Sequence, residues 1–295
     1  MKIAVFTRTG FHHTYFINRL QKHFDIACVV RESYPESYKQ RDIFISGLKN
    51  IFKKDGIVRI KDDIFIKKFC EMYSAGFRYH PALKEYLKSD YDVVIQRAGT
   101  KYIDIKCGEI NSDEFAKRLK ETEPDIIAVL GSSIIKPHII SIPRIAMINL
   151  HSGLSPYYRG TWSYGWPLVN GEPEYLGVTV HHVNPGVDSG DIICQTKPVF
   201  EKNDDLNAIF LKIICEGTEL IIKTIETVIT TGSTASYKQT SDIGRQYFSK
   251  DFNSSVARIC LTNLENGVIE KYNLNRSALD SAVKLYGYIP PSIYR

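Results

Sequence analysis

Apolar residues recur at two different spacings along the chain, and segments of the two kinds alternate. Short apolar runs predict strands at residues 2–6, 25–30, 92–95, 102–106, 124–130, 145–148, 176–183 and 192–200. Apolar positions three and four residues apart predict helices at residues 12–23, 112–122, 161–169 and 205–232. Strands that alternate with helices favour an α/β fold with a doubly wound, mostly parallel sheet.

Two segments depart from this alternation. Residues 37–54 and 62–77 both show helical spacing, so we interpret residues 32–90 as a helical insertion whose lysines form a solvated face. Residues 233–295 are a Ser/Thr-rich connection followed by short helices, which predicts a C-terminal extension to a main domain of residues 1–232. We expect the tyrosines of this extension to lie beside a substrate cleft or in a homodimer interface, and we favour the dimer.

Composition narrows the class of protein. A chain of 295 residues that is 43% hydrophobic can bury a sizeable core. The formal net charge of +5 favours anionic small molecules and is too small for a nucleic-acid-binding surface. The chain has no run of eighteen apolar residues, and Met1 leads directly into a strand pattern. We therefore expect neither a membrane span nor a signal peptide, and a cytoplasmic location.

The six cysteines are scattered without a Cys-x-x-Cys pair, which predicts reduced thiols rather than a disulfide framework or a zinc site. The first predicted strand and helix are joined by a turn that contains only Gly10, so the Gly-x-Gly-x-x-Gly motif for dinucleotides is missing. His181 and His182 are neighbours on a predicted strand and point to opposite faces, which argues against a metal site. A nicotinamide enzyme and a metalloenzyme are both disfavoured.

Three polar side chains with complementary chemistry lie within residues 147–188. Asn149 and His151 follow an apolar run and are two positions apart, so an extended chain presents both on one face. The turn at residues 184–186 precedes Asp188. An amide, a titratable ring and a carboxylate at strand ends could converge on one reacting centre.

Four motifs in this region resemble the 10-formyltetrahydrofolate-dependent formyltransferase family, which includes glycinamide ribonucleotide, methionyl-tRNA and nucleotide-sugar N-formyltransferases. The motifs are Asn149-Leu-His151, Pro156-Tyr-Tyr-Arg159-Gly160, Gly177-Val-Thr179 and Asp188-Ser-Gly190. The loop departs from the usual family wording at Ser152, Gly153 and Ser155. The resemblance implies a Rossmann-like formyltransferase fold and 10-formyltetrahydrofolate as co-substrate, without a metal.

The resemblance also implies roles for individual residues. Asn149, His151 and Asp188 would be catalytic, with His151 and the Asn149 amide stabilising an oxyanion and Asp188 orienting His151 or accepting a proton. The pterin ring of the folate would contact Gly131, Ser132, Ser133, Ile134, Ile135 and Val187. The amine substrate would contact Arg8, His12, His13, Tyr157, Tyr158, Arg159 and Gly160. Without the resemblance, the two serines could equally be turn residues, and the first-loop residues could be a solvated helix start.

The acceptor remains open among several amines. The extension resembles that of nucleotide-sugar N-formyltransferases, so we favour the amino group of a nucleotide-linked amino sugar, for the synthesis of surface polysaccharides such as lipopolysaccharide. Transfer RNA is disfavoured because residues 233–295 lack a basic stripe and are shorter than the barrel domain of the methionyl-tRNA enzymes. Glycinamide ribonucleotide is the alternative acceptor. A folate- or nucleotide-binding protein without turnover is the alternative outside enzymes.

Overall fold

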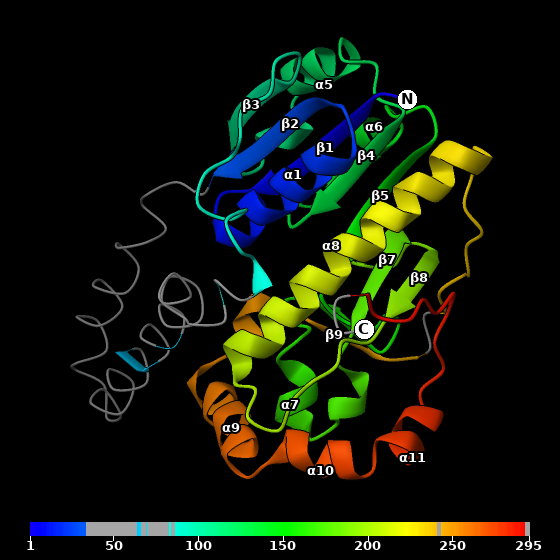
Figure 1. Cartoon of the computed structure of the whole chain (residues 1–295). Helices are drawn as coiled ribbons and strands as arrows, with labels where there is room; N and C mark the ends of the chain where they lie inside the picture. Colours follow the sequence, from blue (N-terminus) through cyan, green and yellow to red (C-terminus); the bar gives the residue numbers. More distant parts are fainter. Residues whose placement is uncertain (34–63, 66–68, 70–82, 84–85, 241–242, 293–295) are drawn as a thin grey trace.

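A seven-stranded sheet with the order β3-β2-β1-β4-β5-β7-β8 forms the centre of the molecule (Figure 1). This computed structural model describes residues 1–33, 64–65, 69, 83, 86–240 and 243–292. The strands are β1 (Ile3–Arg8), β2 (Ile26–Ser33), β3 (Lys101–Lys106), β4 (Ile126–Leu130), β5 (Ala146–His151), β7 (Val178–His182) and β8 (Ile192–Thr196). The first five run parallel, whereas β7 pairs antiparallel with both β5 and β8. The predicted doubly wound, mostly parallel sheet is confirmed.

Neighbouring residues of a strand point to opposite faces of the sheet, so a strand that is apolar throughout has two apolar faces. Helices cover both of these faces. Val5 of β1 packs in the larger core with residues of α1 (Phe11–His23) and α8 (Leu206–Thr231). Phe6, the next residue, packs in a second core with residues of α5 (Asp113–Lys120) and α6 (Pro137–Ile140). Figure 1 shows α1 and the long helix α8 crossing the same face of the sheet.

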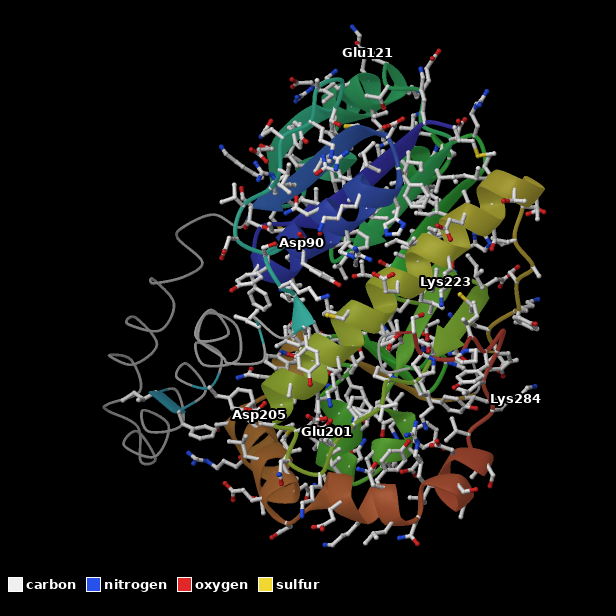
Figure 2. All side chains as sticks on the ribbon, in the orientation of Figure 1. Asp90, Glu121, Glu201, Asp205, Lys223 and Lys284 are labelled. Atoms are coloured by element: carbon white, nitrogen blue, oxygen red, sulfur yellow. The ribbon has the colours of Figure 1, made fainter. Side chains whose placement is uncertain are left out.

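The starts of two helices follow the capping signals in the sequence. The Ser112 hydroxyl accepts a hydrogen bond from the Phe115 amide of α5 at 3.2 Å. The Asp205 carboxylate accepts one from the Ala208 amide at the start of α8 (Figure 2), at 2.8 Å. A side-chain acceptor at this position satisfies an amide that has no partner within the helix, and typically stabilises it by about 1 kcal/mol.

The C-terminal extension packs against the loop that follows β5. Its strand β9 (Arg245–Tyr247) pairs parallel with β6 (Tyr158–Gly160) in a small separate sheet. The remaining short elements are α7 (Trp166–Asn170), α9 (Ser254–Glu265), α10 (Val268–Leu274), α11 (Arg276–Ser281) and the 3-10 helices η3 (Glu109–Asn111), η4 (Pro173–Tyr175) and η5 (Ser249–Asp251). Trp166 stacks on Tyr247 of the extension with ring centroids 3.9 Å apart. The extension is thus part of the same packed body as residues 158–166.

Four sequence predictions need correction or lie outside the described residues. Residues 92–95 form no strand, because the buried Asn18 side chain of α1 bonds the backbone of Asp90, Val93 and Ile95 in place of a strand partner. The helix predicted from residue 161 begins at Trp166, and β8 ends at Thr196 rather than at residue 200. The predicted insertion at residues 32–90 lies largely outside the described residues.

Cys28, Cys107, Cys194, Cys215 and Cys260 are free thiols, whereas Cys70 lies outside the described residues. None of the described helices is long and apolar enough to cross a membrane.

Candidate active site

A cavity of about 530 Å³ opens at the carboxyl ends of β1, β4 and β5. The strand order reverses between β1 and β4, and such a switch point is where doubly wound sheets bind ligands. The predicted site residues that line the cavity are Arg8, His12, His13, Gly131, Ser132, Ser133, Ile134, Ile135, Asn149, His151, Gly160, Val187 and Asp188. Segments that are distant in sequence therefore meet in one cavity.

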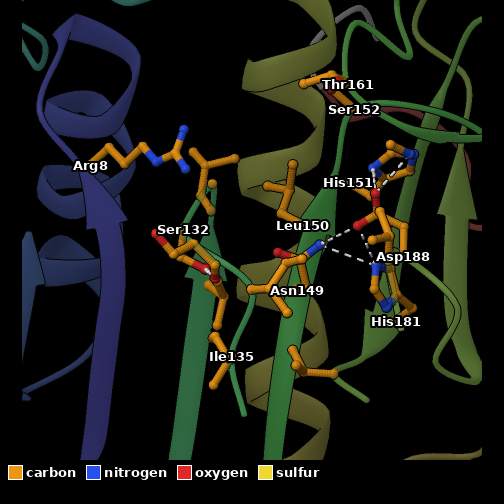
Figure 3. A pocket seen from close by; sticks show the side chains of 18 of the residues that line it. Arg8, Ser132, Ile135, Asn149, Leu150, His151, Ser152, Thr161, His181 and Asp188 are labelled. Carbon is orange, nitrogen blue, oxygen red and sulfur yellow. Dashed lines mark hydrogen bonds and ion pairs between the residues drawn. The ribbon is translucent and has the colours of Figure 1, made fainter. Parts of the chain in front are cut away.

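The Asp188 carboxylate lies at the centre of the polar cluster (Figure 3). Its Oδ2 is 3.3 Å from His151 Nδ1 and accepts a hydrogen bond from the Gly160 amide at 2.9 Å. Its Oδ1 is 3.5 Å from His181 Nε2 and 3.4 Å from Asn149 Nδ2. Asp188 has a positive φ of 46°, a conformation that is uncommon outside glycine and places its side chain back towards β5.

The electrostatics of the cluster favour an ionised carboxylate. Burial alone would raise the pKa of Asp188, but the neighbouring His151 and the hydrogen bond from the Gly160 amide outweigh burial and hold it well below its usual range. Burial lowers the pKa of His151, and the Asp188 carboxylate opposes that shift. The His151 side chain is 5% exposed, so its charge state depends on these few neighbours.

Both ring nitrogens of His151 face acceptors of the protein. Nδ1 faces the Asp188 carboxylate, and Nε2 lies 2.8 Å from the Tyr158 carbonyl oxygen. A carbonyl and a carboxylate only accept hydrogen bonds, so the protonated ring matches both neighbours. A substrate oxygen can gain this N–H donor only by replacing the Tyr158 carbonyl.

Asn149 turns its amide nitrogen away from the cavity centre and towards β7. Its Nδ2 is 3.1 Å from His181 Nε2 and 3.4 Å from Asp188 Oδ1. The resemblance implies that this amide donates to an oxyanion. In the structure both N–H groups face acceptors of the protein, so the carboxamide presents its oxygen as an acceptor instead.

His181 belongs to the cluster and was missed as a site residue from the sequence. It lies opposite Asn149 in the antiparallel register of β5 and β7 and is 3% exposed. The strand pattern by itself predicts only that His181 and His182 point to opposite faces of the sheet. The signal that could have found His181 is the pairing of the predicted strands 145–148 and 176–183, which places it beside Asn149.

The loop between β1 and α1 supplies a group of nitrogen-bearing side chains. The Thr7 hydroxyl donates to the Leu130 carbonyl at 2.8 Å and therefore accepts from His13 Nδ1 at 2.7 Å. Burial and the nearby His12 and Arg8 lower the pKa of His13 well below its ordinary value. Burial also lowers the pKa of His12 to about 4. The two rings are thus neutral at pH 7, and Arg8 is the cation of this wall.

The loop after β4 forms the wall assigned to the pterin. The Glu32 carboxylate accepts hydrogen bonds from the Ser133 amide at 2.6 Å and from the Gly108 amide at 3.0 Å. It therefore ties this loop to the end of β2. Ile134 is 65% exposed and Ile135 is buried, so an exposed apolar side chain stands at the cavity rim. A flat ring could cover this side chain and bond the polar backbone beside it.

Three residues predicted to contact the amine substrate do not line the cavity. The Tyr157 hydroxyl donates to the Lys284 carbonyl at 3.0 Å. The Tyr158 ring is 1% exposed and its hydroxyl donates to Glu172. Arg159 follows Tyr158 in the sequence, and its Nε is buried without a hydrogen-bond partner among the described residues. The backbone pairing of β6 with β9, the Tyr157 hydrogen bond and a hydrogen bond from Arg245 to the Tyr158 hydroxyl hold this loop to the extension.

The extension contributes residues to the wall of the cavity. Tyr247, Phe248 and Ser249 line the cavity together with Trp162 of the main domain. Phe248 is 49% exposed, while Trp162 stacks on Phe252 with ring centroids 4.5 Å apart. This wall presents aromatic surface to whatever occupies the cavity. Among the described residues, no group of three His, Cys, Asp or Glu side chains could hold a metal ion.

The fold and the polar cluster define an α/β protein with a candidate acid–base site at the switch point of its sheet. Residues 86–225 match the sequence model of the formyl transferase family. This match covers 140 of the 295 residues, so the similarity to that family is shown for this part of the chain.

Known proteins that resemble part of the chain are formyltransferases too. A methionyl-tRNA formyltransferase of Desulforamulus reducens is 36% identical over 117 residues, which is 39% of this chain and 37% of that protein. The chain thus spans well under two thirds of that curated relative.

Three solved structures share the fold. A sugar N-formyltransferase from Shewanella sp. has a TM-score of 0.52 at 14% identity, over 90% of this chain and 88% of that one. A phosphoribosylglycinamide formyltransferase from Anaplasma phagocytophilum has a TM-score of 0.51 at 15% identity, over 84% and 97% of the two chains. A sugar 3N-formyl transferase studied in the presence of dTDP and 5-N-formyl-THF has a TM-score of 0.50 at 17% identity, over 86% and 71%.

Proposed function

We propose that this protein is an N-formyltransferase that moves the formyl group of 10-formyltetrahydrofolate to a primary amine. The observation that carries the proposal is the convergence of Asn149, His151 and Asp188 in one cavity at the carboxyl ends of the strands. A carboxylate beside a buried imidazole and a carboxamide can move a proton and stabilise a developing oxyanion.

Each residue of the cluster has a distinct part in the proposed transfer. The neutral amine attacks the formyl carbon and loses one proton, and the bond from that carbon to the folate nitrogen breaks as that nitrogen takes up a proton. His151, released from the Tyr158 carbonyl, donates to the oxyanion, and a donor of this kind typically contributes about 3 kcal/mol. Asp188 is ionised and accepts the amine proton directly or through water.

The co-substrate would lie against the loop after β4. Ser132, Ser133 and Ile134 would edge and cover the flat ring, and Val187 lines the same cavity. Glu32 fixes two amides of this region, so the loop is preorganised before binding. A fold relative studied with 5-N-formyl-THF supports a folate ligand in this class of cavity.

For the acceptor, we propose the amino group of a nucleotide-linked amino sugar, in the synthesis of surface polysaccharides. The aromatic wall of Trp162, Tyr247 and Phe248 suits a sugar or a base, since aromatic faces bury much area at little entropic cost. Arg8 supplies a cation for the diphosphate on the opposite wall. On this proposal the extension serves the substrate side of the cavity. The homodimer remains a prediction.

A thermal-shift screen of the full chain tests the ligand classes. We expect stabilisation by 5-formyltetrahydrofolate and by nucleoside diphosphates such as dTDP and UDP, because a ligand that binds only the folded state raises the melting temperature. Stabilisation by glycinamide ribonucleotide instead of nucleoside diphosphates would point to the purine substrate. Stabilisation by folate and methionyl-tRNA alone would contradict the amino-sugar acceptor and favour the substrate named for the Desulforamulus relative.

A further inference from the structure

His181 and Asn149 form a hydrogen-bonded pair across two antiparallel strands. They are register partners on β5 and β7, so their side chains leave the same face of the sheet. Asn149 Nδ2 lies 3.1 Å from His181 Nε2, and both residues line the cavity. Figure 3 shows this contact beside the one between Asn149 and Asp188.

The second nitrogen of His181 fixes which end of the ring can accept. Nδ1 lies 2.7 Å from the carbonyl oxygen of His182. A carbonyl oxygen only accepts, so Nδ1 carries the proton and donates it there. In the neutral ring Nε2 is then a lone pair, which matches an N–H of Asn149. The distance of 3.5 Å from Nε2 to Asp188 Oδ1 is longer than an ordinary hydrogen bond.

We propose that His181 is a positioning residue for formyl transfer, because it fixes which end of the Asn149 carboxamide faces the substrate. The inference rests on the proposed function. Two acceptors, His181 Nε2 and Asp188 Oδ1, hold the NH₂ group on the β7 side. The reverse orientation would place Asn149 Oδ1 against both acceptors, which is unfavourable.

The carboxamide oxygen is then free to bind the incoming amine. Among the described residues, Asn149 Oδ1 has no hydrogen-bond partner, and Asn149 is only partly buried. An oxygen fixed in this position accepts an N–H of the attacking amine and aligns the nitrogen lone pair with the formyl carbon. Misplacement of such a group by about 1 Å can cost about 100-fold in rate. His181 acts on the reaction through Asn149 and does not touch the reacting atoms.

Two substitutions separate positioning from packing. His181→Phe keeps a ring of similar size and removes the acceptor, whereas His181→Gln keeps an acceptor oxygen near the position of Nε2. We expect His181→Phe to lower kcat by about 10- to 100-fold with little change in the folate KM, and His181→Gln to restore most of kcat. His182→Phe is the matched control, since that side chain lies on the other face of β7 and does not line the cavity.

A double-mutant cycle tests whether the effect passes through Asn149. In an Asn149→Ala background, His181→Phe should cause almost no further loss of kcat. Equal losses from His181→Phe in both backgrounds would overturn the proposal, as would equal damage from His181→Gln and His181→Phe.

Nitrogen-15 NMR of the full chain gives a readout that does not depend on turnover. We expect a proton on His181 Nδ1, a bare Nε2, and a shifted Asn149 side-chain NH₂ signal in His181→Phe. A proton on Nε2 in the neutral ring would overturn the pairing even if formyl transfer is observed. The expected signals without turnover on any amine would instead contradict the proposed function and leave the hydrogen bond in place.

Discussion

The Asp188 carboxylate lies 3.3 Å from His151 Nδ1, although β7 separates the two residues along the chain. The turn after β7 brings the carboxylate back to the end of β5, where it also accepts the Gly160 amide. Because its pKa is held well below the usual range, Asp188 is ionised wherever the protein is folded and active. A fixed negative charge beside a buried imidazole is the feature on which the proposed chemistry depends.

Replacement of that carboxylate should abolish most of the activity without unfolding the protein. Asp188→Asn keeps the shape and removes the charge, so we expect kcat to fall by about 100-fold or more. Asp191→Asn is the matched control, because Asp191 is exposed and lies three residues away. Steady-state kinetics and circular dichroism on both variants make the comparison. Near-normal turnover in Asp188→Asn would contradict the assigned role.

Acid should destabilise the protein through its buried neutral histidines. The pKa of His12 falls from 6.5 to about 4 on folding, and that of His13 also falls, so the folded state binds fewer protons than the unfolded state. The contribution of these histidines to the free energy of unfolding is therefore fully present above about pH 6.5. It is lost progressively as the pH falls towards 4. For His12 alone the loss at pH 5 is on the order of 2 kcal/mol.

Urea denaturation at pH 7 and pH 5 measures this loss. His12→Asn should show a smaller difference between the two pH values than the wild type, because it removes one titrating group. His138→Asn, at an exposed position, should leave the difference unchanged. An identical pH dependence in all three proteins would show that His12 is not buried in its neutral form.

The contact between Gly160 and the extension should be essential for closing the cavity. A methyl group at Gly160 would lie 2.0 Å from the Tyr247 carbonyl oxygen, at a φ of +91°. We expect Gly160→Ala to destabilise the protein by roughly 3 kcal/mol and to weaken nucleotide binding, since Tyr247 and Phe248 would move. Gly171→Ala has a similar φ of +70° but meets no atom within 4 Å, so it should cost only about 1 kcal/mol.

Thermal denaturation and nucleotide binding of the two alanine variants decide this point. If Gly160→Ala behaved like Gly171→Ala in both assays, the extension would not be held by the pairing of β6 and β9.

Hydrophobic spacing predicted most of the sheet because buried strands and amphipathic helices have different periods. It failed at residues 92–95, where Val93 and Ile95 are apolar yet exposed. There the backbone is bonded by Asn18, a partner more than seventy residues away in the chain. Local sequence carries no signal for such a distant side chain.

The candidate site was predictable to a similar extent. Asn149, His151 and Asp188 belong to short motifs, so their convergence could be expected from the sequence. To predict that His181 belongs to the site, one must know the register of β5 against β7. To predict that Tyr158 is buried away from the cavity, one must know how its loop packs. Both depend on tertiary contacts. Aromatic residues in a turn next to a catalytic motif are compatible with either a substrate platform or a loop anchor.

The most direct test of formyl transfer is a labelled-donor assay with the full chain. Purified protein is incubated with 10-formyltetrahydrofolate carrying carbon-13 in its formyl group and, separately, with nucleotide-linked amino sugars, glycinamide ribonucleotide and methionyl-tRNA. Mass spectrometry then follows the label. We predict labelled N-formyl sugar from the wild type and from Asp191→Asn, and almost none from Asp188→Asn. Folate binding without transfer of the label to any of the three amines would contradict the proposed function.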